Sequence, residues 1–571
     1  MQLVRKFRIP ALLCAFAVLL CELIARPFTT MGICDDGPYI RMAQTLAATG
    51  HIAYNGWSTA MLGWQLYLGA AFIKLFGDSF TTVRMSTLLI AMLTAFLLQR
   101  TLVRAGLSER NATLGTLALV LSPLYLILSV TFMTDINGLF AILLCLYGCL
   151  RALQASTSRA TIAWLCFAVV ANALCGTSRQ IAWLGVLIMV PSTLWLLRAH
   201  RRVVLAGAAA TLAGALFVFA CLQWFKHQPY SVGMMPPLKP AISVTRGLGE
   251  LTHALLDIPF LLLPVFALFL PGIWSKNRRS IAVVAAISLA YILIAVQRGY
   301  IPMLEPTKGD WVNALGMLHE AGFKGEPPVL LHTGAQVLLT IASLGGLLGL
   351  ISSLLQSRRA LPAPASPNGA SWNQLNFLLI PFTLAYIVLL MPLGSTFGLT
   401  DRYLLGPTLV AAILLIRYYQ ERIQPQLPMA FTLLIALMAI YGVAATHNNF
   451  AFYRARVALA AELNAAGIPD TSVDNNWEYN FDVELQHTDH INDYRIVLPA
   501  HAYIPTPPLP AGTCPMYFFD ETPHIRPIYG VSFDPNACYG PAPFAPIHYS
   551  RWLGSSPGTL HVVRYTPPAI H

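Results

Sequence analysis

Charged residues are scarce in this sequence. Only 11% of the 571 residues are Asp, Glu, Lys or Arg, whereas 56% are hydrophobic. A soluble domain carries about 25% charged residues and cannot hide so large a share of apolar side chains in its cores. The shortage of charge therefore excludes an ordinary soluble protein and predicts a polytopic membrane protein.

Internal repeats are also absent, and the only low-complexity tract is a short linker, ALPAPASPNGAS, at 360–371. Acidic residues are fewer than basic ones, 25 against 36, which leaves a net charge of +11. Because the basic residues gather in short loops between apolar runs, this excess indicates membrane topology rather than nucleic-acid binding.

Long apolar runs fill most of residues 1–446. The N-terminus, MQLVRKFRIPALLCAFAVLLCELIA, has the basic start and apolar middle of a secretory signal. No convincing cleavage site follows, so we interpret it as a retained first span. A span needs about 20 apolar residues. We expect about thirteen spans, near 9–28, 80–99, 113–131, 136–150, 160–176, 180–197, 203–224, 259–275, 280–297, 329–355, 374–393, 403–419 and 428–446.

Basic residues predict the orientation of these spans. With a cytoplasmic N-terminus, every short inner loop carries at least two Lys or Arg. Examples are Arg100, Arg104, Arg110, Arg198, Arg201, Arg202, Lys276, Arg278 and Arg279. We therefore expect a protein of the inner (cytoplasmic) membrane, with loops 29–79, 225–258 and 298–328 and the C-terminal tail on the outer side.

The tail at 447–571 is predicted to be a separate outer domain. It opens with a helical pattern, AFYRARVALAAELNAAG, and continues with strand-like runs, YRIVLP, MYFF and HVVRY. Eight of the ten cysteines lie in or beside apolar spans, and only Cys514 and Cys538 lie in this tail. In an oxidising compartment these two are expected to form a disulfide that staples a small α/β domain.

Two adjacent acids follow the first span in GICDDGPYIRMAQTL, where Asp35 and Asp36 precede an amphipathic pattern. Helical spacing places Tyr39, Met42, Ala43 and Leu46 on one face, opposite Arg41, Gln44 and Thr45. We expect an interfacial helix begun by Pro38, followed by a second, more apolar segment with Trp57, Trp64 and Tyr67. The acids either cap this helix or serve a functional site at the membrane surface.

Other charged residues are expected at the same depth. Asp135 lies in the short outer turn TFMTDINGLF, Arg179 lies in CGTSRQIAW, and Asp401 and Arg402 open the twelfth span. A cap could explain Asp135, and snorkelling could explain the arginines. A guanidinium beside acids on an outer face is also what a phosphate-bearing lipid requires.

The stretches DDGPYIRMAQTLAATG, FMTDINGLF and DRYLLGP occur in this order and on one side of the membrane. With them the chain resembles the GT-C class of integral-membrane glycosyltransferases, most closely the protein O-mannosyltransferase and aminoarabinose transferase branch. The resemblance implies an all-α membrane domain at 1–446 and an outer C-terminal domain. It implies that Asp35 is the catalytic base, with Asp36 where many members have Glu, and that Asp135 is the second-loop acid. Arg179 and Arg402 match positions suggested to face the lipid phosphate, and Arg41 is a further phosphate-binding candidate.

The resemblance also implies a reaction. Members of the class transfer a sugar from a polyprenyl-phosphate or diphosphate donor to an acceptor hydroxyl with inversion. We expect a carboxylate to take the proton of the hydroxyl and cations to stabilise the leaving phosphate. The acceptor is a glycan, a lipid or a protein. Three acids could bind a divalent metal, but the branch does not generally need one, so the cofactor stays unassigned.

Two alternatives remain open. A transporter or lipid flippase would also have many spans, but its ionisable residues should lie near mid-span. A surface-glycan polymerase or ligase would share the outer site and use a large lipid-linked acceptor. In the tail, His487, Asp489 and His490 of LQHTDH could bind zinc, although His pairs in polar loops are more often bystanders.

Overall fold

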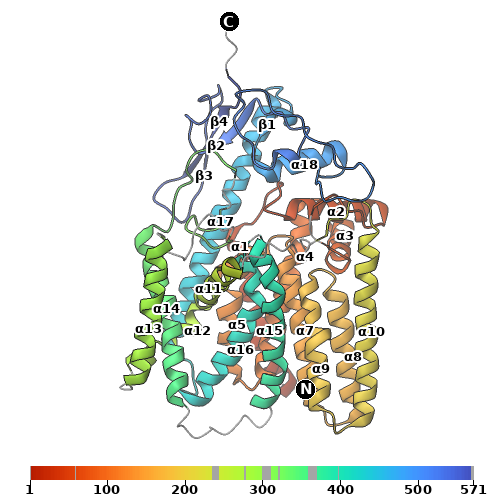
Figure 1. The fold of residues 1–571 in the computed structure, drawn as a ribbon, viewed down its shortest axis with the longest axis vertical. Coiled ribbons are helices and arrows are strands. Elements are labelled where there is room, and N and C mark those ends of the chain that lie inside the picture. Colours follow the sequence, from red (N-terminus) through yellow and green to blue (C-terminus); the bar gives the residue numbers. More distant parts are fainter. Residues whose placement is uncertain are drawn as a thin grey trace.

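A computed structural model describes residues 2–57, 60–233, 244–274, 278–298, 310–318, 322–357, 369–396 and 398–567. Long helices stand side by side in its lower part, and a small sheet with one helix lies above them (Figure 1). Helix α1 (Gln2–Ala25) starts at the lower end of this layer, whereas strand β4 (Gly558–Arg564) lies in the sheet above it. The protein is a mostly helical, multi-pass membrane protein.

Seven helices in the described part of the chain are long and apolar enough to cross a membrane. They are α4 (Phe80–Arg104), α7 (Thr134–Leu153), α8 (Ser158–Cys175), α10 (Arg201–Lys226), α14 (Thr333–Ser357), α15 (Trp372–Thr396) and α17 (Met429–Ala465). Helices α5 (Glu109–Val120) and α6 (Pro123–Ser129) meet at 69° and would make an eighth span together. The bend falls at Pro123, which cannot donate a backbone hydrogen bond. The expected number of about thirteen spans stays a prediction.

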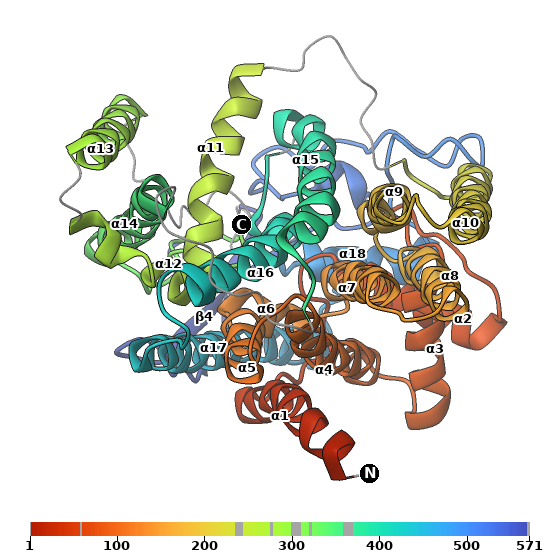
Figure 2. The same ribbon diagram turned by 90° about the horizontal axis from the view of Figure 1, so that it is seen from below.

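The other expected spans are also helical, but several are shorter or broken. They are α1 (Gln2–Ala25), η1 (Gln180–Trp183), η2 (Gly185–Met189), α9 (Val190–Leu196), α11 (Val244–Leu261), α12 (Leu263–Ala267), η3 (Leu270–Trp274), α13 (Arg278–Arg298) and α16 (Leu405–Arg422). Figure 2 shows α13 and α14 nearly end-on, whereas α11 lies across the view. Apolar length alone therefore did not predict which segments stand upright.

Helices α4 and α7 start at the same end of the layer. Near the start of α4, Arg84 binds Asp36, and the Phe132 N–H just before α7 donates to the same carboxylate. At the opposite end, the Gln154 amide donates to the carbonyl of Arg104. The 20 residues of α7 span about 30 Å, the thickness of the hydrocarbon core.

The loop between α1 and α4 contains α2 (Asp36–Thr49) and α3 (Trp64–Phe76), which lie beside the start of α4 (Figure 1). The apolar face predicted for α2, from Tyr39 to Leu46, is buried as its spacing requires. The expected start at Pro38 is wrong, because the helix begins at Asp36. The capping interpretation is wrong as well. Asp35 occupies the N-cap position without a side-chain cap bond, since both acids bind arginines instead.

The C-terminal part begins without a break, because α17 continues through the expected boundary at 446/447 to Ala465. A four-stranded sheet follows in the order β1 (Val473–Asp474), β2 (Tyr529–Ser532), β4 (Gly558–Arg564) and β3 (Ile547–Tyr549). Strand β1 pairs with β2 in parallel, and the other two pairs are antiparallel. The short helices are η5 (Asp401–Leu404), α18 (Asn476–Thr488), η6 (Asp470–Ser472) and η7 (Phe519–Glu521).

Strand prediction in the tail was partly wrong. HVVRY lies largely in β4, but YRIVLP and MYFF contain no strand. Ile496 is buried, but Val497 is 78% exposed and Leu498 is 41% exposed, so the stretch does not present a regular apolar face that would favour pairing. The structure joins Cys514 and Cys538 in a disulfide between two loops of this region.

Candidate functional site

Asp35 lies at the start of α2 with its carboxylate between two donors. The Nη2 of Arg402, in η5, is 3.0 Å from Oδ2 of Asp35. The indole N–H of Trp57 donates to Oδ1 over 3.2 Å. The Asp35 side chain keeps 16% exposure. This acid is therefore oriented from two sides and still open to an incoming group.

Asp135 forms a second acid–arginine pair at the start of α7. Its carboxylate is 2.7 Å from Nη1 of Arg179, which also donates to Thr134 Oγ1 over 3.0 Å. The arginine lies across Gly138, where a Cβ atom would come within 2.6 Å of its Cδ. Glycine at 138 thus gives Arg179 room to reach Asp135.

Tyr403 brings the two pairs together. Its ring centre is 5.2 Å from the guanidinium carbon of Arg402 and 5.2 Å from that of Arg179. The hydroxyl of Tyr386 holds this residue by donating to its backbone carbonyl over 3.1 Å. Because an aromatic face attracts cations, Tyr403 stabilises two like charges close to one another. Our sequence reasoning missed this residue, although an aromatic residue directly after Arg402 was visible in DRYLLGP.

Asp36 has a different role from Asp35. Arg84 donates to both of its oxygens, over 2.8 and 3.0 Å, and both side chains are fully buried. The same carboxylate accepts backbone N–H groups of Ile33 and Phe132 over 2.6 and 3.2 Å. Asp36 therefore connects the loop between α1 and α4 to α4 itself and to the turn before α7. Arg84 was missed by our sequence reasoning, and its only signal was a charge inside a predicted span.

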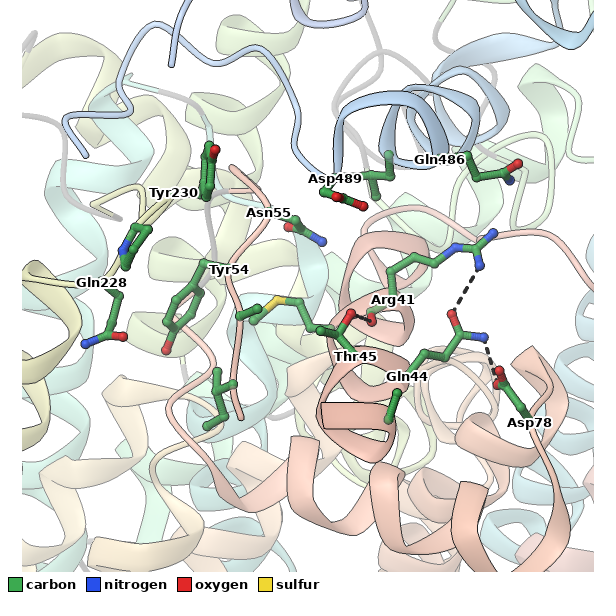
Figure 3. A pocket seen from close by; sticks show the side chains of 16 residues that line it. Arg41, Gln44, Thr45, Tyr54, Asn55, Asp78, Gln228, Tyr230, Gln486 and Asp489 are labelled. Carbon is green, nitrogen blue, oxygen red and sulfur yellow. Dashed lines mark hydrogen bonds between the residues drawn. The ribbon is translucent and has the colours of Figure 1, made fainter. Parts of the chain in front are cut away.

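Arg41 does not join these pairs. Its guanidinium binds Asp482 of α18 through Nε and Nη2, over 2.7 and 2.9 Å. Arg41 lines a separate cavity of about 730 Å³, drawn in Figure 3, whose lining does not include Asp35, Asp135 or Arg402. The bidentate geometry connects α2 with α18 rather than with a phosphate site.

Aromatic side chains cover the Asp35 side of the site. The ring of Trp57 is 4.6 Å from Phe481 and 5.9 Å from Trp477, both on α18, and 6.3 Å from Phe518. Beside Asp35, burial raises the pKa of the Cys34 thiol well above its usual range. Cys34 is therefore a neutral packing residue here, and the C-terminal region supports the loop that carries the second donor to Asp35.

Asp401, the other acid expected near Arg402, binds backbone groups instead. Its carboxylate accepts the N–H groups of Trp311 and Val312 over 3.1 and 2.9 Å. Burial raises its pKa to about 6, although these hydrogen bonds and Arg402 act in the opposite direction. Asp401 thus connects the segment 310–312 to η5 and helps to place Arg402.

Three buried polar side chains near the second pair have unused hydrogen-bonding atoms. Within the described residues, Gln65 Oε1, the Asn137 amide and Ser178 Oγ have no hydrogen-bond partner. Gln65 is held next to the turn before α7, because its Nε2 donates to the carbonyls of Phe132 and Met133. Buried polar atoms are normally paired, so these atoms indicate a place where a polar ligand could bind.

The three expected acids do not form a metal centre with one another. Across the described ranges, no group of three or more His, Cys, Asp or Glu is placed to hold a metal ion. Two of the residues proposed as zinc ligands in the tail have other partners. His490 contacts the carbonyl of Thr488 through Nδ1 over 2.7 Å, and His487 stacks on His524. The cations that face the candidate acids Asp35 and Asp135 are arginine side chains.

Residues 52–228 match the family model of the dolichyl-phosphate-mannose-protein mannosyltransferases. This match confirms the predicted resemblance to the protein O-mannosyltransferase branch over these residues. No curated protein matches the chain.

The solved structures that are similar to this chain include the following three, all at low identity. The S. cerevisiae protein O-mannosyltransferase Pmt1–Pmt2 complex bound to the sugar donor has 19% identity and a TM-score of 0.32, over 38% of this chain and 33% of that chain. ArnT from Cupriavidus metallidurans bound to undecaprenyl phosphate has 14% identity and a TM-score of 0.38, over 81% of this chain and 82% of that chain. AglB from Archaeoglobus fulgidus in complex with an inhibitory peptide and a dolichol-phosphate has 15% identity and a TM-score of 0.40, over 90% of this chain and 64% of that chain. At these TM-scores the likeness carries no argument about residue roles.

Proposed function

We propose that this protein is a membrane glycosyltransferase that moves a sugar from a polyprenyl-phosphate-linked donor to an acceptor hydroxyl, with inversion and with Asp35 as general base. One observation carries the proposal. Of the three candidate acids, Asp35 alone combines an adjacent guanidinium with a partly exposed carboxylate, whereas the side chains of Asp36 and Asp135 are fully buried.

Asp35 suits the task of a general base. A base must be oriented and must keep an oxygen free to meet the acceptor proton. Arg402 and Trp57 each hold one oxygen from one side, which leaves each oxygen a further lone pair. As the hydroxyl oxygen attacks the anomeric carbon, Asp35 accepts its proton and the bond to the lipid phosphate breaks.

The two arginines suit the leaving group. A guanidinium carries five N–H donors, so Arg402 and Arg179 can hold their carboxylates and contact phosphate oxygens as well. Charge that develops on the phosphate is stabilised most by cations that are already in place. Gln65 contacts the turn before α7, and Asn137 and Ser178 are close to Asp135 and Arg179 in the chain, so we infer that their unused polar atoms bind sugar hydroxyls.

We further propose that this site faces the outer side of the cytoplasmic membrane. The basic turn at Arg104 lies at the end of α4 opposite Arg84 and the acids. Loops rich in Lys and Arg stay in the cytoplasm, which supports an outer location for the acid–arginine pairs and for the C-terminal sheet.

The distribution of charge disfavours a transporter. In the seven candidate spans, Asp, Glu, Lys and Arg lie within about two turns of a helix end or in the C-terminal part of α17. There, Arg456 pairs with Glu478 of α18 outside the helix layer. A transport path would place ionisable residues near mid-span.

Asp35→Asn tests the proposal, because Asn keeps the size of the side chain and removes the basic oxygen. We expect release of polyprenyl phosphate from a panel of polyprenyl-phosphate sugars to fall by about two orders of magnitude or more. The melting temperature should stay close to that of the parent protein. Full activity of the variant, or no transfer by the parent protein from any donor of the panel, would refute the proposal.

A further inference from the structure

The cavity beside Arg41 lies between segments that are far apart in the sequence. It has a volume of about 730 Å³, within the range of small-ligand sites. Its walls come from α2, from the segments 52–55 and 228–230, and from the end of α18 (Figure 3). Figure 3 shows Asp489 and Asn55 near its centre, with Tyr54 and Tyr230 on one side and Arg41 and Gln44 on the other.

One wall is held rigid by a chain of polar contacts. Asp78 accepts from the amide of Gln44 over 2.8 Å, and Gln44 accepts from Arg41 over 3.3 Å. Beyond Arg41, Asp482 accepts from the amide of Gln486 over 3.1 Å. Side chains whose positions are already fixed in this way lose little conformational entropy when a ligand binds.

The balance of charge in the cavity is negative. The single basic residue of the lining, Arg41, is already neutralised by Asp482. Asp78 and Asp489 also line it, and within the described residues the Asp489 carboxylate has no hydrogen-bond partner. This balance repels phosphates and carboxylates. Carboxylate and amide groups on a rigid wall are instead good partners for hydroxyl groups.

Two lining residues have unusual backbones. Tyr230 has φ +56° and Asp489 has φ +60°, in the left-handed region that bulky side chains rarely adopt. The ring of Tyr230 is supported by His490, with 4.5 Å between ring centres. Asp489 adopts this conformation as the C-cap of α18, which is common at helix ends, whereas Tyr230 is a bulky residue that its surroundings hold there.

The cavity and Asp35 are connected through the chain in two ways. Residues 41–48 of α2 follow Asp35 by six to thirteen positions, which corresponds to about 9–20 Å along a helix. In the second connection, Asn55 lines the cavity, donates to the carbonyl of Pro38 over 2.9 Å and accepts the N–H of Trp57 over 3.3 Å. A chain-like acceptor seated in the cavity would therefore have to extend over about 9–20 Å to present a hydroxyl at Asp35.

We propose that this cavity binds a neutral, hydroxyl-rich saccharide segment of the acceptor. The role as an acceptor site rests on the proposed transferase function, whereas saccharide binding itself does not. Asp489 and Gln486 supply hydrogen bonds from α18, and Tyr230 supplies an aromatic face. The acceptor is thus a glycan or glycolipid that is held several sugar units away from its reacting hydroxyl.

Binding of maltotriose, cellotriose and mannotriose to the full-length protein in detergent tests the proposal. We expect at least one trisaccharide to bind the parent protein. Asp489→Ala and Gln486→Ala should each weaken its affinity about tenfold, the scale of one lost hydrogen bond to a charged or fixed partner. Glu462→Ala is the matched control, because Glu462 is an exposed acid on α17 outside the cavity. The affinity of the Glu462→Ala variant for the trisaccharide should equal that of the parent protein.

The outcomes separate this proposal from the proposed reaction. If no trisaccharide binds, or if both cavity variants bind like the control, the cavity is not a saccharide site. Tighter binding of trilysine than of any trisaccharide would also overturn the proposal and assign the cavity to a basic peptide. If trisaccharides bind as expected but no lipid-linked sugar is ever transferred, saccharide binding stands and the transferase function fails.

Discussion

Asp35 and Asp36 are adjacent in the chain, but their surroundings give them different properties. Asp35 contacts Arg402 and remains partly exposed, whereas Asp36 and Arg84 exclude solvent entirely. A buried ion pair contributes little net stability, yet removal of one partner leaves an isolated buried charge. The same conservative substitution should therefore affect activity at one position and folding at the next.

Asp36→Asn should lower the free energy of unfolding by about 3–5 kcal/mol, because Arg84 would remain buried without its countercharge. Thermal unfolding in detergent measures this effect. The double variant Asp36→Asn with Arg84→Met should recover part of the loss, since it removes the uncompensated charge. If the single variant melts like the parent protein, Asp36 does not anchor the loop in the way described above.

Trp57→Phe should reduce kcat/KM about tenfold or more with little change in melting temperature. The substitution removes the N–H that orients Asp35 and keeps a ring against Phe481 and Trp477. A hydrogen bond to a charged group contributes about 1.5–3 kcal/mol. Phe518→Leu is a control that alters the aromatic cover without removing the donor. Equal losses in both variants would mean that packing, and not the hydrogen bond, positions Asp35.

Helices α2 and α18 are the elements that join the membrane part to the C-terminal part near the site. Arg41 of α2 pairs with Asp482 of α18, and Trp57, in the loop that follows α2, contacts Trp477 and Phe481 of α18. The amphipathic pattern of α2 predicted its buried face correctly. The pattern could not predict that Arg41, on the opposite face, would meet a helix from the tail rather than a phosphate.

Arg41→Met and Asp482→Asn should behave alike, because they remove the two sides of one contact. Each should lower the free energy of unfolding by about 1 kcal/mol, since the pair is partly exposed to solvent. Neither should change the donor KM, whereas Arg402→Met should lower kcat/KM for the donor strongly. A raised donor KM for Arg41→Met alone would restore the original assignment of Arg41 to the donor phosphate.

At the scale of the whole molecule, the acids, the arginines, α18 and the sheet all lie toward one end of the helix layer (Figure 1). Basic turns such as that at Arg104 lie at the other end. This polarity predicts that a reporter fused after His571 reads as extracytoplasmic, and that one inserted after Arg198 reads as cytoplasmic. A cytoplasmic reading at His571 would place the site on the wrong side for the proposed acceptors.

The sequence by itself determined where helices form and which residues are candidates for the reaction. Apolar length and helical spacing are local properties, so all thirteen expected spans contain helix and the inner face of α2 was predicted correctly. Asp35, Asp135, Arg179 and Arg402 were also named from local signals, namely charges at the outer ends of apolar runs.

Only the tertiary structure decided which acid meets which arginine. Asp36 and Arg84 are 48 positions apart, Arg41 and Asp482 are 441 apart, and Asp35 and Arg402 are 367 apart. Such pairs depend on how helices pack, which no local pattern encodes. The upright or tilted course of each helix was likewise decided by packing against its neighbours, because a bilayer accepts any apolar helix of sufficient length.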